Sequence, residues 1–171
     1  MAPTQVDLLE GIYAGKDLAP ATLARLRECY VFYHRQWWCH REMFHRFRWQ
    51  HGLLNALALL IVAMGMIIGP VLENALWATC LTAAGTVVKG WNELKNFALK
   101  MEMARYAFTT YEKTMNELRT YARGLPIEEL DGFLIKMQVT DDTMAELVPP
   151  ISDRIAQGYD QQYDKSEETP V

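Results

Sequence analysis

The chain has 171 residues, a formal net charge of −4 at neutral pH and 50% hydrophobic residues, and this length predicts a single domain. It carries no P-loop, dinucleotide fingerprint, kinase motif or nucleophile elbow, so the enzyme classes that depend on these motifs are excluded. We therefore expect a protein that is not an enzyme and that holds no cofactor.

Residues 1–19 are mixed in character and form an N-terminal segment with room for a short helix at most. From Pro20 the pattern becomes regular, because apolar and aromatic residues recur at steps of three and four between Leu23 and Phe47. Pro20 suits the first turn of a helix, where its missing N–H leaves no hydrogen bond unmade. Because nothing interrupts this pattern before Leu72, we expect one helix from Pro20 into the apolar block that follows.

The apolar block contains two uncharged stretches, Gly52–Leu72 and Asn74–Val88. The first would form about 31 Å of helix, which is enough to cross a hydrocarbon core. The second is shorter and reaches spanning length only if Lys89 extends to the membrane surface and Trp91 lies in the interface. The sequence therefore predicts two transmembrane spans, at about residues 52–72 and 74–91, joined by a tight turn.

Basic residues flank this block on both sides, with six Arg between Arg25 and Arg48 and seven Lys or Arg between Lys89 and Arg123. Positively charged flanks remain on the cytoplasmic side of a membrane. We therefore expect an integral protein of the cell membrane with both termini in the cytoplasm and the lipid bilayer as its partner. The residues expected at the membrane interface are Arg46, Arg48, Trp49, Lys89 and Trp91.

A second periodic stretch runs from Leu94 to Ala122, and Gly124 and Pro126 mark its end. Its length and period match those of the helix before the first span, so the two stretches can bury each other's apolar faces. The predicted fold is an all-α membrane protein, in which a two-helix transmembrane hairpin continues into an antiparallel cytoplasmic coiled coil. This domain covers residues 20–123.

Past the predicted coiled coil, residues 124–159 read as short helices. The first covers Ile127–Val139, and Thr140 or Asp141 caps a second over Asp142–Val148, which Pro149 and Pro150 end. A further helix over Ile151–Tyr159 is possible by pattern. Residues 160–171 are polar and charged with few apolar residues, which predicts a disordered tail.

Histidines and aromatic residues gather between Tyr30 and His51, and we considered a metal site and a nucleic-acid surface there. His40 and His45 are five residues apart and share no helix face, and no zinc-binding spacing is present. The adjoining membrane already accounts for Arg interleaved with Trp and Phe. We therefore expect no metal and no nucleic-acid partner, and interpret the segment as a packed aromatic helix near lipid headgroups.

Two sets of residues within the spans are candidate functional sites. Gly65 and Gly69 form a G-x-x-x-G pair, which permits close helix packing either within the chain or against a neighbouring protomer. Thr79, Thr82 and Thr86 share one face of the second span, and with Asn55 they are candidates for lining a pore. Alternatively, the threonines hydrogen-bond to carbonyls of their own helix and need no water-filled space.

The layout of these segments resembles the SLATT domains, two-transmembrane effector domains associated with nucleotide-sensing proteins. The resemblance rests on Tyr33–Trp49, on the hairpin Gly52–Val88 and on Lys100–Leu118, and it covers residues Ala21 to Arg123. It implies an oligomeric, pore-forming membrane effector of a defence or cell-death system that responds to a nucleotide signal. Because no sensor domain is expected within this sequence, the resemblance implies either a separate nucleotide-sensing partner or no sensor.

The leading functional hypothesis is therefore a homo-oligomeric membrane effector, because two spans cannot enclose a channel alone. The alternative is a membrane scaffold or interaction protein whose spans are anchors, or an accessory subunit of a larger membrane complex.

Overall fold

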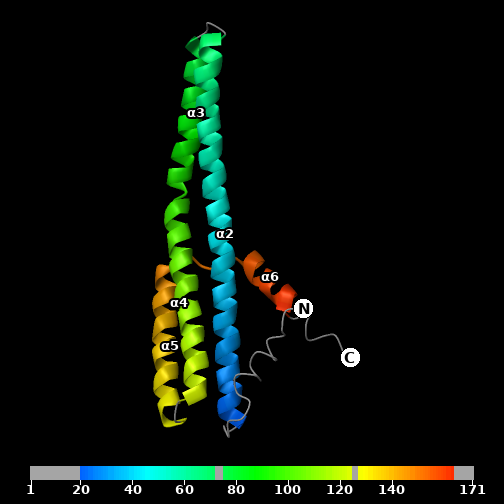
Figure 1. Ribbon diagram of the computed structural model, residues 1–171, viewed down its shortest axis with the longest axis vertical. Helices are drawn as coiled ribbons and strands as arrows, with labels where there is room; N and C mark the ends of the chain where they lie inside the picture. The colour runs from blue at the N-terminus through cyan, green and yellow to red at the C-terminus, as the bar shows by residue number, and fades with distance from the viewer. Residues whose placement is uncertain (1–19, 72–74, 125–126, 164–171) are drawn as a thin grey trace. The chain divides into compact units, whose positions relative to one another are not determined.

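A computed structural model of the chain describes residues 20–71, 75–124 and 127–163, and the described residues are helical apart from short connections and contain no strand. The predicted all-α class is therefore confirmed for this part of the chain. The whole predicted N-terminal segment, residues 1–19, and residues 164–171 of the predicted tail lie outside the described residues. The helices are α2 (Pro20–Val71), α3 (Ala75–Leu94), α4 (Phe97–Gly124), α5 (Ile127–Leu147) and α6 (Asp153–Tyr163) (Figure 1).

The chain divides into two compact units, which we call unit 1 (residues 1–43 and 103–171) and unit 2 (residues 44–102). Helix α2 contributes to both, because it continues without a break from Pro20 to Val71. This continuity is what the uninterrupted apolar pattern predicted. Unit 1 contains the first part of α2, most of α4, and all of α5 and α6. The sequence prediction had separated α5 and α6 from the domain of residues 20–123, but the structure groups them with part of that domain.

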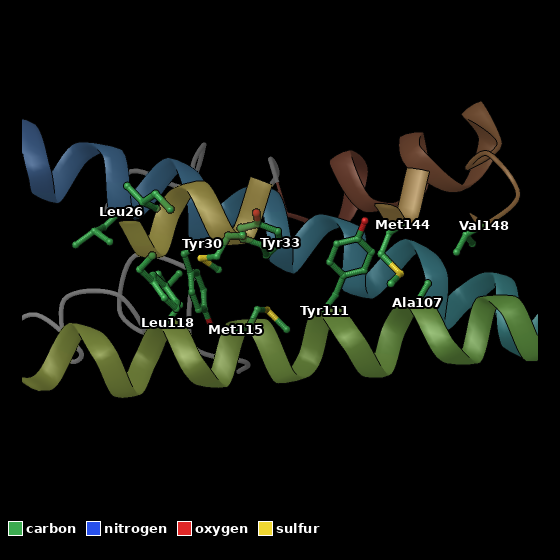
Figure 2. Close-up of a cluster of buried hydrophobic side chains, with 12 residues drawn as sticks. Leu26, Tyr30, Tyr33, Ala107, Tyr111, Met115, Leu118, Met144 and Val148 are labelled. Carbon is green, nitrogen blue, oxygen red and sulfur yellow. The ribbon is translucent and has the colours of Figure 1, made fainter. Parts of the chain in front are cut away.

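The core of unit 1 is built by three helices, α2, α4 and α5. Figure 2 shows side chains of these helices directed into the space that the helices enclose. Tyr30 and Leu118 are almost completely buried there, and the fully buried Ala107 lets neighbouring helices approach closely. The buried cluster comprises Leu26, Tyr30, Tyr33, Ala107, Tyr111, Met115, Leu118, Phe133, Leu134, Met137, Met144 and Val148.

Polar contacts accompany this apolar core. The Tyr111 hydroxyl donates a hydrogen bond of 2.8 Å to the Asp141 carboxylate, which joins α4 to α5. Arg119 of α4 donates to the Tyr30 hydroxyl, and its guanidinium lies over the Tyr30 ring at 5.4 Å from the centroid. The Tyr111 contact gives a buried hydroxyl a specific partner, which an apolar contact alone would not provide.

Helix α5 is longer than the sequence pattern indicated. We expected two helices with a cap at Thr140 or Asp141, and this was wrong, because a single helix runs from Ile127 to Leu147. The hydroxyls of Thr140 and Thr143 donate to the carbonyls of Lys136 and Val139, at 3.0 and 2.8 Å, and therefore do not cap a new helix. The expected stop at the two prolines is present, since α5 ends just before Val148.

Helix α6 also extends beyond its expected end. We assigned residues from Asp160 onward to a disordered tail, but α6 continues to Tyr163, so residues 160–163 are helical. The cause is long-range contact with α2: Arg35 and Asp160 form an ion pair of 2.9 Å, and the rings of Tyr159 and Tyr163 lie against His34. Tertiary contact thus orders a polar segment whose composition alone predicts disorder.

In unit 2, α3 lies alongside the second part of α2 (Figure 1). Gly65 is close to Ala78 and Leu81, and Gly85 is close to Ala58 and Val62. Residue numbers fall along α2 as they rise along α3, so the two helices are antiparallel. Helix α3 ends at Leu94, and Asn96 adopts a positive φ of 51° before α4 begins; asparagine tolerates this left-handed conformation better than most residues.

The most apolar part of α2 is poorly covered by protein. Among the described helices, α2 alone is long and apolar enough to cross a membrane, within Ala24–Ile68, and its most apolar window has a mean hydropathy of 2.1 with 11% of it buried. The helix that forms the core of a soluble protein would be mostly buried. Helix α3 is shorter and carries Lys89 and Glu93, and it is not long and apolar enough to count as a candidate membrane span.

The buried His40 predicts that acid destabilises unit 1. His40 is 5% exposed and stacks on Tyr111, and its Nδ1 has no hydrogen-bond partner among the described residues. Burial lowers the His40 pKa to about 4. An unfolded chain protonates histidine near pH 6.5, so between these values unfolding takes up a proton. The unfolding free energy should therefore fall by up to about 3 kcal/mol from pH 6.5 to pH 4.

Urea unfolding of the full chain in a neutral detergent, followed by circular dichroism at several pH values, measures this loss. His40→Leu should remove most of it, and the matched variant of an exposed histidine, His45→Leu, should leave it in place. Burial and the charge of Arg119 lower the His34 pKa as well, so a smaller dependence should remain in His40→Leu. The same pH dependence in His40→Leu and the unchanged protein would contradict the assignment.

Candidate functional site

The candidate site lies within unit 2, where two glycines bring α2 and α3 into close contact. A Cβ atom on Gly85 would lie 2.6 Å from the Val62 side chain, closer than packed atoms allow, and in tight contact at 3.1 Å with the Ala58 carbonyl oxygen. A Cβ atom on Gly65 would lie 3.1 Å from Leu81 Cβ. Both positions therefore require glycine or a local shift of the opposite helix. Gly69 belongs to α2, but its surroundings lie outside the described residues.

At the end of unit 2 that carries most of its basic residues, three polar side chains form a closed ring of hydrogen bonds. Asn92 is 4% exposed, and its Nδ2 donates to Asn55 Oδ1 at 2.8 Å. Asn55 Nδ2 lies 3.0 Å from His51 Nε2, and His51 Nδ1 lies 3.3 Å from Asn92 Oδ1. His51 Nδ1 also lies 3.1 Å from Asn92 Nδ2, and the tautomer decides which Asn92 atom it bonds. With the imidazole proton on Nδ1, it donates to Asn92 Oδ1, and each of the three side chains donates one bond and accepts another.

The sequence predicted that Asn55 lines a pore, whereas in the structure its amide takes part in the hydrogen-bond ring. Its amide is directed to His51 of its own helix and to Asn92 of α3, so its hydrogen-bonding groups have partners within the chain. Unpaired amides in an apolar surrounding are costly, and a closed ring avoids that cost. Whether Asn55 also faces a lumen stays a prediction.

The three threonines of α3 each hydrogen-bond to their own helix. Thr79, Thr82 and Thr86 donate to the carbonyls four residues earlier, at 2.9, 2.8 and 2.9 Å, and all three are exposed. They lie on one flank of α3, beside the face that contacts α2. The hydroxyls therefore need no outside partner for their donors, and the Thr82 hydroxyl oxygen lies 3.5 Å from the Cβ position of Gly65 on α2.

An open groove of about 420 Å³ lies along this flank, between α2 and α3. Asn55 and Thr86 border it together with Lys89, and the apolar side comes from Leu59 and Val62. The structure thus brings together Asn55 of α2 with Thr86 and Lys89 of α3. We call these three residues, together with Thr79 and Thr82, the polar flank.

The predicted interface residues are exposed at one end of unit 2. Trp49 is 67% exposed, and Arg46 and Arg48 beside it are also exposed. Trp91 is exposed too, with the Lys95 ammonium 4.8 Å from its ring centroid. Lys89 borders the groove of the polar flank. Such a set of cationic and indole side chains is typical of a membrane boundary.

No three His, Cys, Asp or Glu side chains are grouped as metal ligands within the described residues. The polar flank offers amide, hydroxyl and ammonium groups and, among those residues, no nucleophile paired with a base. These groups can donate and accept hydrogen bonds.

The geometry defines an all-helical protein with one long apolar helix that could span a membrane. No protein-family model matches the chain, and neither the curated proteins nor the solved structures give a match.

Sequence reasoning missed three members of the contact between α2 and α3. Gly85 was overlooked because it has no second glycine at a spacing of four residues in α3, although a single small residue suffices for close approach. His51 was considered only as part of the histidine cluster, and Asn92, one residue beyond the predicted second span, was not considered. A signal was present, since one buried amide in the first span implies a polar partner on the second.

The hydrogen-bond ring predicts a loss of stability when one member is removed. Asn92→Ala should lower the stability of the chain by about 1–3 kcal/mol, because Asn55 and His51 each lose a buried partner. Thermal unfolding in neutral detergent, followed by circular dichroism, measures the change. Glu93→Ala truncates the exposed neighbouring side chain and should leave the transition almost unchanged. Equal midpoints for both variants would show that the hydrogen-bond ring contributes nothing to stability.

Proposed function

We propose that this protein is an oligomeric membrane effector, in which α2 and α3 of several protomers surround a pore. Residues about 52–72 and 74–91 would be the two spans, and the basic flanks would hold both termini in the cytoplasm. The polar flank would face the lumen, and the remaining surface of the helix pair would face lipid.

The observation that carries this proposal is the exposed apolar surface of unit 2. Leu59 is 71% exposed, and many other large apolar side chains of the α2–α3 pair are exposed as well. Soluble monomers rarely expose a continuous apolar patch of this kind. The exposed residues on α2 are Leu53, Leu57, Leu59, Leu60, Met64, Met66, Ile67 and Val71, and those on α3 are Leu76, Trp77, Val87, Trp91 and Leu94.

The distribution of polar groups supports a lumen. Within this apolar pair, Asn55, Thr86 and Lys89 border one groove, and Thr79 and Thr82 continue the same flank. Polar side chains within a membrane gather toward a bundle interior or a watery space. Because two helices cannot enclose a channel, the lumen requires further copies of the chain.

The resemblance to SLATT domains supports an effector role in defence or cell death that is triggered by a nucleotide signal. On that reading a separate protein senses the nucleotide and acts on unit 1.

The alternative is a membrane scaffold, or an accessory subunit, in which the two helices are anchors. One observation favours it specifically: the threonine hydroxyls already donate to carbonyls of their own helix, so the polar flank can face lipid without unpaired donors. A scaffold needs no fixed number of protomers and no conductance, whereas a pore needs both.

Conductance across planar bilayers, measured after the mass of the detergent-solubilised protein, separates the two functions. The pore predicts a discrete assembly of four or more protomers. Thr86→Leu, which places bulk on the polar flank, should lower single-channel conductance about twofold or more. Ala84→Leu adds bulk at an exposed position on the opposite side of α3 and should leave conductance unchanged.

A monomer or dimer without conductance would favour the scaffold. Equal conductance in Thr86→Leu and Ala84→Leu, with assembly intact in both, would contradict the assignment of the polar flank to a lumen.

A further inference from the structure

A second groove, of about 700 Å³, lies on α2 itself, apart from the polar flank. Its lining residues recur at steps of three and four along the helix, so they share one side of it. That side is turned roughly 130° from the side that contacts α3 through His51, Asn55 and Ala58. The groove residues are His45, Arg48, Trp49, Gly52, Leu53 and Ala56.

Gly52 adds no side chain to this groove, and a Cβ atom built on it would meet nothing within 4 Å. Trp49, exposed over two thirds of its surface, stands beside this opening. The space is therefore open to a ligand from outside the chain.

The chemistry of the groove changes along its length. His45 and Arg48 lie at one end, and Leu53 and Ala56 lie at the other, about 16 Å apart along the helix axis from first residue to last. A phospholipid has the same order of groups, a charged headgroup followed by acyl chains. An arginine guanidinium binds phosphate oxygens through paired hydrogen bonds, and an indole ring suits the level of the ester groups.

The surrounding charge favours an anionic lipid. Among the described residues of unit 2, Arg46, Arg48, Lys89, Lys95 and Lys100 carry positive charge. The acidic residues among them are Glu93 and Glu102. A headgroup with net negative charge is attracted to this end of unit 2, whereas a zwitterionic headgroup gains much less.

We infer that the groove around Gly52 is a binding site for one anionic phospholipid, with the headgroup phosphate at Arg48 and an acyl chain along Gly52, Leu53 and Ala56. The inference rests on the membrane placement in the proposed function and adds a specific lipid site to it. It does not depend on pore formation.

Native mass spectrometry of the full chain in a neutral detergent tests the site, with dioleoyl phosphatidylglycerol and dioleoyl phosphatidylcholine as probes. The unchanged protein should bind the anionic lipid saturably and at least about tenfold more tightly than the zwitterionic one. Arg48→Gln should weaken the binding of phosphatidylglycerol about tenfold through loss of the charge-assisted contact. Gly52→Leu should weaken it similarly by filling the groove.

Two matched controls separate the groove from general surface charge and from added bulk. Arg46 is two residues from Arg48 and projects toward nearly the opposite side of α2, so Arg46→Gln removes the same charge at the same depth. Gly90→Leu adds the same side chain to α3 at a glycine whose Cβ position is also open. Both controls should bind phosphatidylglycerol within about twofold of the unchanged protein.

Equal losses in Arg46→Gln and Arg48→Gln would overturn the site in favour of diffuse attraction, and so would equal affinity for the two lipids. If Gly52→Leu lowers the helix content, Ala56→Phe fills the same groove from its apolar end and takes its place. Alkaline carbonate extraction distinguishes failure of the lipid site from failure of the membrane placement. A protein that stays in the membrane without lipid preference refutes the lipid site alone, and a protein that is released refutes the membrane placement as well.

Discussion

The second part of α2 has more apolar surface than the other helices of this chain cover. This uncovered apolar surface constrains the rest of unit 2. Helix α3 is the element of unit 2 that packs along it, and it reaches only the side marked by Ala58, Val62 and Gly65. The backbone groups are satisfied within each helix, so the helices can tolerate an apolar solvent that offers no hydrogen bonds. The polar side chains cannot, and they are accordingly paired in the hydrogen-bond ring or bonded back to their own helix.

The same helix serves a different purpose in unit 1. There Tyr30 and Tyr33 are buried against α4 and α5. The Tyr30 hydroxyl accepts a hydrogen bond from Arg119, and the Tyr111 hydroxyl of α4 donates one to Asp141. Unit 1 therefore has a buried core in which these two hydroxyl groups are paired. One continuous helix carries both patterns: the buried residues of its first part end at Met43, and the exposed large aliphatic residues of its second part begin at Leu53.

The sequence predicted the helices well where the pattern was long and periodic. The start of α2 at Pro20 and the end of α4 at Gly124 follow from local backbone preferences, which neighbouring residues decide. The uninterrupted α5 and the ordered end of α6 could not be predicted in the same way. Thr140 suits a cap and a helix interior about equally, and the contacts of Asp160 and Tyr163 join residues more than a hundred positions apart. The site shows the same limit, since Asn55 and the threonines were recognised singly but the pairing of His51 with Asn92 depends on how α3 aligns with α2.

That alignment has a consequence for movement. The hydrogen-bond ring fixes the register between the helices, because sliding α3 by one turn would carry Asn92 about 5.4 Å along the axis and separate it from both partners at once. Gly85 opposes the same displacement, since its neighbours on α2 would meet a residue with a side chain instead. Rotation of the pair as a rigid body disturbs neither contact. We therefore expect a conformational change to tilt or rotate α2 and α3 of unit 2 together, and not to slide one helix along the other.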